Sequence, residues 1–107
     1  MKKPKELLSA FEKSVYEATA KIPCGRVTTY AEIARKIKKP GSARAVGNAL
    51  NKNPFAPKVP CHRVVKTDGT VGGFASGSEK KKVILKKEGI QFNNEKILHF
   101  NEKFIKL

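Results

Sequence analysis

The stretch that decides the fold is TYAEIARKIKKPGSARAVGNALN, residues 29–51. Apolar residues in its first half recur at helical spacing, and Thr29 stands three residues before Glu32, as a capping box requires. A Pro-Gly pair then interrupts the pattern, and Ser42 stands where the N-cap of a second helix belongs. Two short helices joined by a tight turn predict a helix-turn-helix.

The second helix of this pair, expected over Ala43–Asn51, has two unlike faces. Ala43, Val46 and Leu50 share one face and should pack inward. The other face carries one long side chain, Arg44, among small or short polar residues: Ala45, Gly47, Asn48 and Asn51. A helix that reads the major groove presents several long polar side chains to base edges. This face therefore indicates either a helix that enters a narrow minor groove with one inserted cation, or tight packing against another helix.

Shorter elements are expected on both sides of the pair. A helix over Lys5–Ala20 has Pro4 suited to its first turn, and Arg26–Thr28 reads as a connector or short strand. Val64–Val65 reads as a second short strand. These elements predict a mainly α fold with short strands, a helix-turn-helix of the winged-helix kind.

The last part of the chain should hold one further helix. Ser78 reads as the cap of a last helix over Glu79–Lys87, which Gly89 would end. In the tail, residues 90–107, apolar and polar residues alternate only weakly. It is expected to form a hairpin about Asn93-Asn94 or to pack as an irregular flap.

The charge balance narrows the class of partner. A chain of 107 residues fits one domain over residues 1–107 rather than two. Lys and Arg total 23 against 9 Asp and Glu, so the formal net charge is +14. This excess is typical of proteins that bind nucleic acid, although a solvated lysine-rich surface gives the same composition.

The composition also excludes several classes. No apolar run approaches the roughly 20 residues of a membrane span, and Met1–Ala10 lacks the apolar core of a secretory signal, so no membrane partner is expected. Cys24 and Cys61 do not make a disulfide framework, and with only His62 and His99 to join them we expect no metal site. The expected location is the cytoplasm, in association with the nucleoid.

Cys61 follows Pro60 and precedes His62 and Arg63. The proline stiffens the backbone that presents the thiol. A thiol reacts as its thiolate, and His62 is a candidate base. Adjacent side chains of an extended segment point to opposite sides, so a contact between the two requires a turn or a bridging water. The alternative is a cysteine that fills the core as a small hydrophobe.

Glu88 is the candidate partner of that histidine. It follows Ile84 and Leu85 on one face of the expected helix, at the end where the helix dipole disfavours an anion. A histidine is a natural partner, because a carboxylate holds its tautomer. Two alternatives remain: Cys61, His62 and Glu88 form a thiol–imidazole–carboxylate relay, or Glu88 lies in solvent beside neighbouring lysines.

Taken in order, these motifs resemble the O6-alkylguanine-DNA alkyltransferases. The run PCHRVV at residues 60–65 is similar to the active-site motif of that family. The likeness covers roughly residues 11–92 and includes these segments: Ile22-Pro23 with Gly25, Thr29–Ala34, Ser42–Gly47, Asn53-Pro54, Gly72–Gly77 and Leu85–Gly89.

The resemblance implies a DNA-repair protein. Such a protein transfers an alkyl group irreversibly from guanine O6 in double-stranded DNA to Cys61, without a cofactor. His62 would take the thiol proton through a water, and Glu88 would orient His62. The protein would act as a monomer on a guanine that is flipped out of the duplex.

The same resemblance implies further roles. Tyr30 would help to flip the nucleotide and donate a proton toward the guanine, Arg44 would replace the flipped base in the stack, and Asn53 would hold the active-site turn. The helix over residues 43–51 would lie in the minor groove. The implied DNA-binding residues are Thr29, Tyr30, Ser42, Arg44, Ala45, Gly47 and Asn48. The implied base pocket is lined by Val64, Phe74, Ala75 and Ser76.

Several features depart from the family pattern. Members usually carry an N-terminal domain before this part, and they often have Tyr where Phe74 stands and Ser where Ala75 stands. The short length resembles the alkyltransferase-like proteins, which bind alkylated DNA and lack the acceptor cysteine. Cys61 favours transfer. The alternatives are a non-reacting lesion-binding protein that recruits another repair pathway, and a small architectural or regulatory protein with Cys61 in its core.

Overall fold

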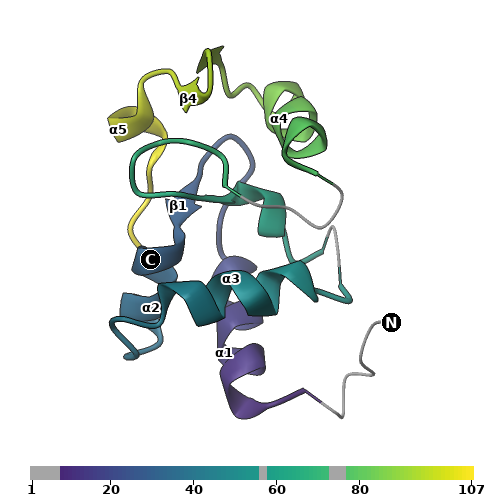
Figure 1. The fold of residues 1–107 in the computed structure, drawn as a ribbon, viewed down its shortest axis with the longest axis vertical. Helices are drawn as coiled ribbons and strands as arrows, with labels where there is room; N and C mark the ends of the chain where they lie inside the picture. The colour runs from purple at the N-terminus through teal and green to yellow at the C-terminus, as the bar shows by residue number, and fades with distance from the viewer. Residues whose placement is uncertain (1–7, 56–57, 73–76) are drawn as a thin grey trace.

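The computed structural model describes residues 8–55, 58–72 and 77–107. Its helices are α1 (Ala10–Thr19), α2 (Tyr30–Lys36), α3 (Ala43–Asn51), α4 (Ser78–Lys87), α5 (Phe100–Lys103) and the 3-10 turn η2 (Cys61–Arg63). Its strands are β1 (Thr28–Thr29), β2 (Val64–Val65), β3 (Phe92–Asn93) and β4 (Lys96–Ile97). The expected mainly helical fold with short strands is confirmed, and Figure 1 shows α1, α2 and α3 together at one end of the molecule.

The helix-turn-helix is present, with α3 over the predicted residues. The Thr29 hydroxyl caps α2 by accepting a hydrogen bond from the Glu32 amide at 3.0 Å. Ser42 is the N-cap of α3, as predicted, but its hydroxyl donates to the Lys39 carbonyl and does not cap the helix amides. Ala43 is only half-buried, because the inward face of α3 is made by residues further along the helix, namely Val46, Ala49 and Leu50.

The first helix begins later than predicted. Leu8 and Ser9 precede it in non-helical backbone, and Pro4 and Lys5 lie outside the described residues. Ser9 and Glu12 form a full capping box, with the Ser9 hydroxyl accepting from the Glu12 amide and the Glu12 carboxylate accepting from the Ser9 amide. This reciprocal cap satisfies two amides of the first turn and fixes the start of α1 at residue 10.

A short parallel pair joins the helix-turn-helix to the rest of the chain. Thr28 pairs with Val64 and Thr29 with Val65, so β1 leads into α2 while β2 follows directly from η2. The first residue of α2, Tyr30, is therefore held beside the turn that carries Cys61. This pairing brings residues that are 36 positions apart in the sequence side by side.

The C-terminal part departs from prediction in two details. Gly77 is the N-cap of α4 and Ser78 is the first helical residue, so Ser78 is not the cap. Gly89 ends the helix as predicted, at a φ of 94°, with the Ile90 amide donating to the Leu85 carbonyl.

The tail forms the hairpin rather than the flap. Strands β3 and β4 are antiparallel, and Asn94 in the turn has a φ of 57°. The unpredicted helix α5 follows, and Phe104 then makes a parallel bridge to Val27. The Leu107 amide donates to the buried Glu32 carboxylate at 2.8 Å, so the tail is fastened to α2.

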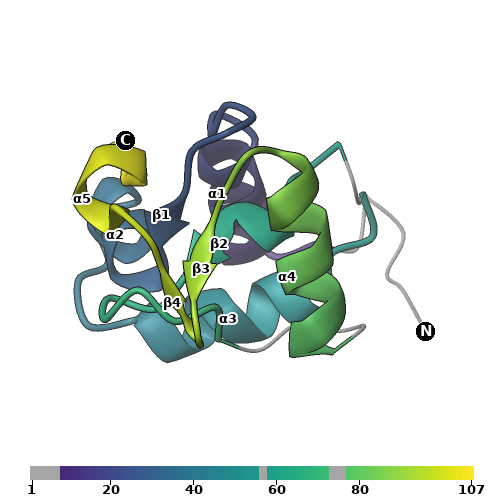
Figure 2. The ribbon, with the colours of Figure 1, turned by 90° about the horizontal axis from the view of Figure 1, so that it is seen from above.

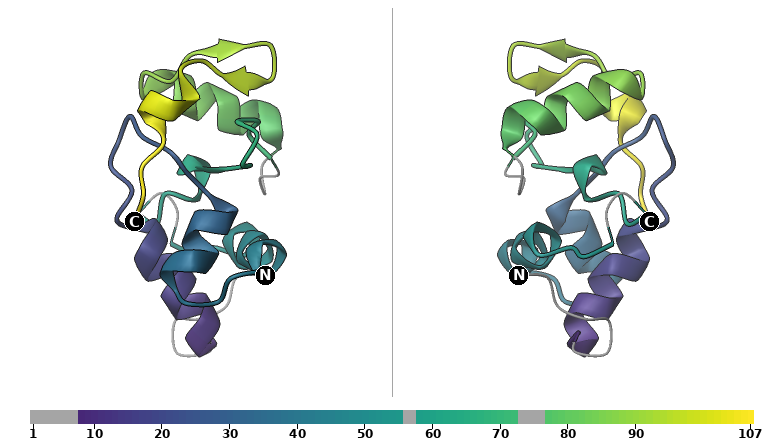
Figure 3. Two further views of the ribbon diagram at one scale, coloured as in Figure 1. Left: turned by 90° about the vertical axis from the view of Figure 1, so that its left-hand side faces the viewer. Right: turned by 90° about the vertical axis from the view of Figure 1, so that its right-hand side faces the viewer.

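Two apolar clusters lie on either side of the parallel pair. One is centred on the three N-terminal helices and includes Val15, Ile33 and Val46, and the other lies beneath α4 and the hairpin and includes Leu85 and Ile90. Figures 2 and 3 show α4 and the hairpin side by side, and Figure 1 shows α4 and β4 at the opposite end of the molecule from α1. In the part of the chain that the structure describes, no helix is long and apolar enough to cross a membrane.

Candidate functional site

The turn η2 carries Cys61 and leads directly into β2. Pro60 precedes it, the Cys61 amide donates to the Val59 carbonyl at 2.8 Å, and the Arg63 amide donates to the Pro60 carbonyl at 2.9 Å. Cys61 is half-buried and packs against the cluster of the N-terminal helices. The sequence segment is therefore a turn and not an extended strand, which removes the reason to place Cys61 and His62 on opposite sides.

Asn53 fastens the segment that leads into this turn. Its side-chain amide donates to the Val59 carbonyl at 2.8 Å, and its side-chain oxygen accepts from the Phe55 amide at 2.9 Å. The residue is 6% exposed. These bonds fasten Asn53 to the backbone of Val59, two residues before Cys61, and to that of Phe55.

His62 and Glu88 meet although they stand 26 residues apart. The His62 Nε2 atom lies 2.9 Å from Glu88 Oε2, and the imidazole is 6% exposed. Of the two alternatives for Glu88, the structure shows the pairing with His62 and not the solvated side chain. A neutral imidazole with Nε2–H facing the carboxylate keeps Nδ1 as a proton acceptor.

Arg63 is the second partner of Glu88, and the sequence analysis did not identify it. Its Nε and Nη2 atoms donate to the two carboxylate oxygens at 2.9 and 2.7 Å, and its Nη1 donates to the Ile22 carbonyl. Hydrogen bonds from Arg63, and to a smaller extent from His62, hold the pKa of Glu88 below its ordinary value against the effect of burial. Glu88 is therefore a carboxylate at neutral pH, beside the histidine.

Tyr30 lies between this turn and the surface. Burial, with a smaller effect of the charge of Cys61, raises the pKa of the Tyr30 phenol to about 12. The ring lies beside Gly47 of α3, where a β-carbon would be 3.7 Å from it. Gly72 has a φ of 73°, and a β-carbon there would be 3.2 Å from the Tyr30 hydroxyl. Glycine at position 72 therefore leaves the space next to that hydroxyl.

Lys81 is the second residue that the sequence analysis missed. It is 0% exposed, and its ammonium donates to the Tyr30 hydroxyl at 3.1 Å and to the Val71 carbonyl. The sequence offered no signal for it, because Lys80, Lys81 and Lys82 are identical in type and only their position on α4 distinguishes them.

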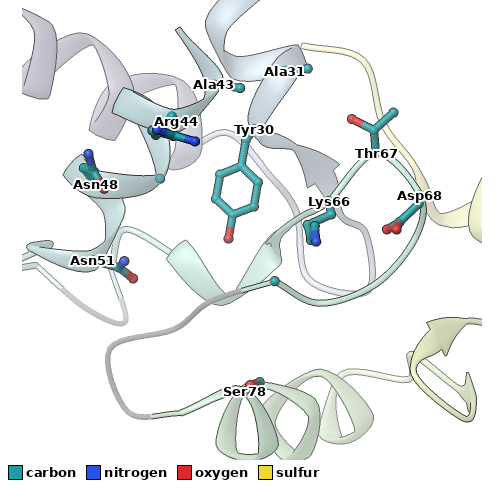
Figure 4. A pocket seen from close by; sticks show the side chains of 12 residues that line it. Tyr30, Ala31, Ala43, Arg44, Asn48, Asn51, Lys66, Thr67, Asp68 and Ser78 are labelled. Carbon is teal, nitrogen blue, oxygen red and sulfur yellow. The ribbon is translucent and has the colours of Figure 1, made fainter.

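A groove of about 810 Å³ opens in front of Tyr30 (Figure 4). Arg44 and Asn48 of α3 lie on one side of the tyrosine and Lys66 and Asp68 on the other. The full lining is Tyr30, Ala31, Ala43, Arg44, Gly47, Asn48, Asn51, Lys66, Thr67, Asp68, Gly72 and Ser78. Arg44 and Asn48 are exposed, as a helix face that meets a polyanion requires.

The other expected site residues differ in how far they are exposed. Ala45 is exposed and Ser42 half-buried, whereas Thr29 is 5% exposed and its hydroxyl is used as the cap of α2. Val64 is fully buried in β2. The remaining expected lining residues of the base pocket, Phe74, Ala75 and Ser76, lie outside the described residues. Among the described side chains, no three of His, Cys, Asp and Glu gather as a metal site would require.

The comparisons with family models, curated proteins and solved structures all indicate one family. Residues 10–90 match the family model of the DNA-binding domain of 6-O-methylguanine DNA methyltransferase. A methylated-DNA–protein-cysteine methyltransferase of Methanosarcina mazei is 51% identical over 78 residues, which are 73% of this chain and 49% of that protein. The chain therefore spans about half the length of the curated relatives it matches.

Two solved structures share the fold. The Mycobacterium tuberculosis OGT in complex with DNA is 42% identical, with a TM-score of 0.74, over 76% of this chain and 50% of that one. The S. pombe Atl1 in complex with damaged DNA containing O6-carboxymethylguanine is 33% identical, with a TM-score of 0.80, over 94% of this chain and 98% of that one.

Proposed function

The chain belongs to the 6-O-methylguanine DNA methyltransferase family, and on this premise we propose that it repairs DNA by moving the alkyl group of an O6-alkylguanine onto Cys61. The observation that carries the proposal is the contact of 2.9 Å between His62 and Glu88, directly after the half-buried cysteine. A thiol, a base and a carboxylate that orients the base are the parts that an activated nucleophile needs.

The reaction we propose forms the bond between Cys61 Sγ and the alkyl carbon and breaks the bond between that carbon and O6. The thiol proton passes to His62 through a water, while Glu88 holds the imidazole. The electron pair of the broken bond stays on the guanine, which takes a proton from the Tyr30 hydroxyl. No cofactor takes part, and the alkylated cysteine is not regenerated.

The groove supplies the proposed contact with DNA. The exposed face of α3 enters the minor groove of a double-stranded segment, because its small residues allow close approach. Arg44 fills the stack that the guanine leaves when it flips toward Tyr30, which costs a few kcal/mol of unstacking. The protein acts as a monomer, as one DNA-binding and alkyl-acceptor domain, in the cytoplasm and in association with the nucleoid.

A second function is favoured by one observation. The fold superposes on S. pombe Atl1 with a TM-score of 0.80, against 0.74 for the M. tuberculosis OGT. On this alternative it binds the lesion without reacting and recruits another repair pathway. The presence of Cys61 with an oriented His62 supports transfer over this alternative.

The mass of the intact protein after incubation with duplex DNA containing O6-methylguanine tests the proposal. We expect a gain of one methylene per molecule, located on Cys61 by peptide mapping. Tight binding of the lesion DNA with no gain in mass would leave the non-reacting function instead, and a methyl group on Cys24 would contradict the assignment of the acceptor.

A further inference from the structure

Two asparagines of α3, Asn48 and Asn51, line the groove with exposed carboxamide groups. Neither carboxamide has a hydrogen-bond partner among the residues that the structure describes. The next asparagine along the chain differs, because the carboxamide of Asn53 is bound to the Val59 carbonyl and to the Phe55 amide. Asn53 supports the fold, whereas the donors and acceptors of the two groove asparagines are left for a ligand.

Arg44, Asn48 and Asn51 form one row along α3. Steps of four and then three residues keep the three side chains within about 60° of one another around the helix axis. Figure 4 shows all three on the same side of Tyr30. At a rise of about 1.5 Å per residue, Asn48 lies about 6 Å and Asn51 about 10 Å beyond Arg44 along the axis. Gly47, beside the row, has no side chain that would hold DNA away from it.

The proposed place of Arg44 fixes where this row meets the duplex. Arg44 fills the stack that the flipped guanine leaves, so the rest of the row lies to one side of the lesion. Successive base pairs are about 3.4 Å apart, so a row about 10 Å long spans roughly three steps. Asn48 and Asn51 therefore face the edges of base pairs within about three steps of the lesion, on one side only.

A carboxamide distinguishes the two kinds of base pair in the minor groove. An A·T pair presents only acceptors there, whereas a G·C pair adds the N2 amine of guanine as a donor. The side chain of asparagine has an oxygen that accepts and an NH₂ group that donates. At a G·C pair both halves form hydrogen bonds, because the oxygen accepts from the N2 amine and the NH₂ group donates to a base acceptor. At an A·T pair the oxygen meets no donor.

The charges around the groove favour base edges over phosphates as the partners of these two side chains. Lys66 is an exposed cation on the opposite side of the groove. A hydrogen bond from an ionised donor to a phosphate is about twice as strong as one from a neutral donor. Cations such as Lys66 therefore suit the phosphates, and the neutral carboxamides suit the groups that carry sequence information.

We infer that Asn48 and Asn51 read the minor-groove edges of the base pairs on one side of the lesion and favour G·C pairs there. The inference rests on the proposed function, from which it takes the minor-groove position of α3 and the place of Arg44. It gives the protein a preference among alkylated sites, which the cluster of His62 and Glu88 does not provide.

Duplexes that differ by a single amine test this inference. Inosine·C lacks the N2 amine of G·C and keeps its major-groove edge, and 2,6-diaminopurine·T adds that amine to A·T. The affinity of Cys61→Ala, which binds without reacting, is measured for O6-methylguanine duplexes with each exchange at the three pairs on either side of the lesion. Removing the amine should weaken binding by about two- to tenfold at one or two positions on one side, and adding it should strengthen binding there by the same factor.

Variants of the two asparagines in the same background show whether they are the readers. Asn48→Ala and Asn51→Ala should each remove the preference at one position, and the double variant should remove both. Alanine favours a helix more than asparagine does, so α3 should keep its fold. Asn101→Ala is the matched control, because Asn101 is exposed on α5 and outside the groove lining, and it should keep the full preference.

Two results would overturn the inference. If the double variant binds every duplex more weakly by one common factor, the asparagines contact phosphates or sugars instead of base edges. If the preference for the amine survives in the double variant, the protein responds to the shape of the duplex rather than through these side chains.

The proposed function fails separately. The intact mass of the wild-type protein reports methyl transfer, whereas the set of duplexes reports recognition. A preference that depends on Asn48 and Asn51, without any gain in mass, would support the inference and leave a non-reacting lesion-binding protein. Methyl transfer with no preference for the amine would support the proposed function and overturn the inference.

Discussion

The groove in front of Tyr30 and the cluster of His62, Arg63 and Glu88 differ in how their charges are held. In the cluster, each charged or titratable group has a partner within 3 Å, and little of it meets water. On the groove side, Arg44 and Asn48 stand on an exposed helix face. A nucleophile requires fixed partners, whereas a surface that meets DNA requires groups that can still exchange water for phosphate.

This contrast predicts that variants of the two regions fail in different ways. Changes in the cluster of His62, Arg63 and Glu88 should alter the rate of transfer and leave DNA binding nearly unchanged. Changes in the groove should alter binding, or transfer from duplex DNA alone.

The largest effect is expected at the acceptor itself. Cys61→Ala should abolish methyl transfer and retain lesion binding, because no other described group takes the place of its thiol. Cys24→Ala is the matched control, since Cys24 is exposed and outside the groove lining, and it should transfer at the wild-type rate. Intact mass and an electrophoretic binding assay measure the two properties, and residual transfer in Cys61→Ala would contradict the assignment.

The next effect concerns the base and its carboxylate. His62→Ala and Glu88→Gln should each slow single-turnover transfer by about 10²- to 10⁴-fold, the range of general acid–base catalysis. Lesion affinity should change by less than about threefold, because neither side chain lines the groove. Wild-type rates in both variants would show that the contact of His62 with Glu88 has no part in activating the thiol.

A variant of Arg63 tests how much the ion pair with Glu88 contributes to the stability of the fold. Arg63→Met should lower the free energy of unfolding at pH 7 by about 1–3 kcal/mol, because the Glu88 carboxylate loses its main partner. Chemical denaturation measures this loss, and the exposed Arg26 offers the matched control, Arg26→Met.

The loss should depend on pH in a definite direction. An unfolded glutamate titrates near pH 4.3, and Glu88 has a lowered pKa in the fold. The contribution of the ion pair is therefore present above that range and is lost as the pH falls through the lowered folded value. Equal losses at pH 7 and pH 3 would contradict the ionic origin of the effect.

The smallest effect is expected from a single groove cation. If the Lys66 ammonium contacts a phosphate, Lys66→Ala should reduce the slope of log affinity against log salt by about 0.9. Lys103 lines a separate hollow with Gly89 and His99, and Lys103→Ala should leave the slope unchanged. A fluorescence titration over a range of salt concentrations measures both slopes, and equal changes in the two variants would place DNA contacts outside the groove.

Sequence reasoning predicted the elements whose signals are local. The limits of α3 and the end of α4 at Gly89 followed from residues a few positions apart, and the hairpin of the tail was one of the two alternatives that the sequence left open. The prediction that Ser78 caps α4 was wrong. Serine is a cap-forming residue type at both position 9 and position 78, but only Ser9 has a glutamate three residues later to complete a capping box. Which serine caps a helix depends on the backbone before it, and here Gly77 takes that position in α4.

The site divides in the same way. The composition and spacing of Cys61, His62 and Glu88 permitted the relay, but left a solvated Glu88 as the alternative. Arg63 and Lys81 could not be predicted, because their roles depend on tertiary contacts: Arg63 reaches a carboxylate 25 residues away, and Lys81 reaches Tyr30 across 51 residues. Long cationic side chains have no periodic signal that distinguishes a buried partner from a solvated one.

The most direct test of the division between groove and cluster is one pair of variants on two substrates. Methyl transfer from lesion duplex and benzyl transfer from the free base O6-benzylguanine are timed for wild type, Arg44→Ala and Glu88→Gln. We predict that Glu88→Gln slows both reactions by the same factor, whereas Arg44→Ala slows the duplex reaction strongly and leaves the free-base reaction within about threefold of wild type, because nothing is flipped there. Equal losses on both substrates for Arg44→Ala would show that α3 supports the pocket rather than the extrusion of the base, and would contradict the account.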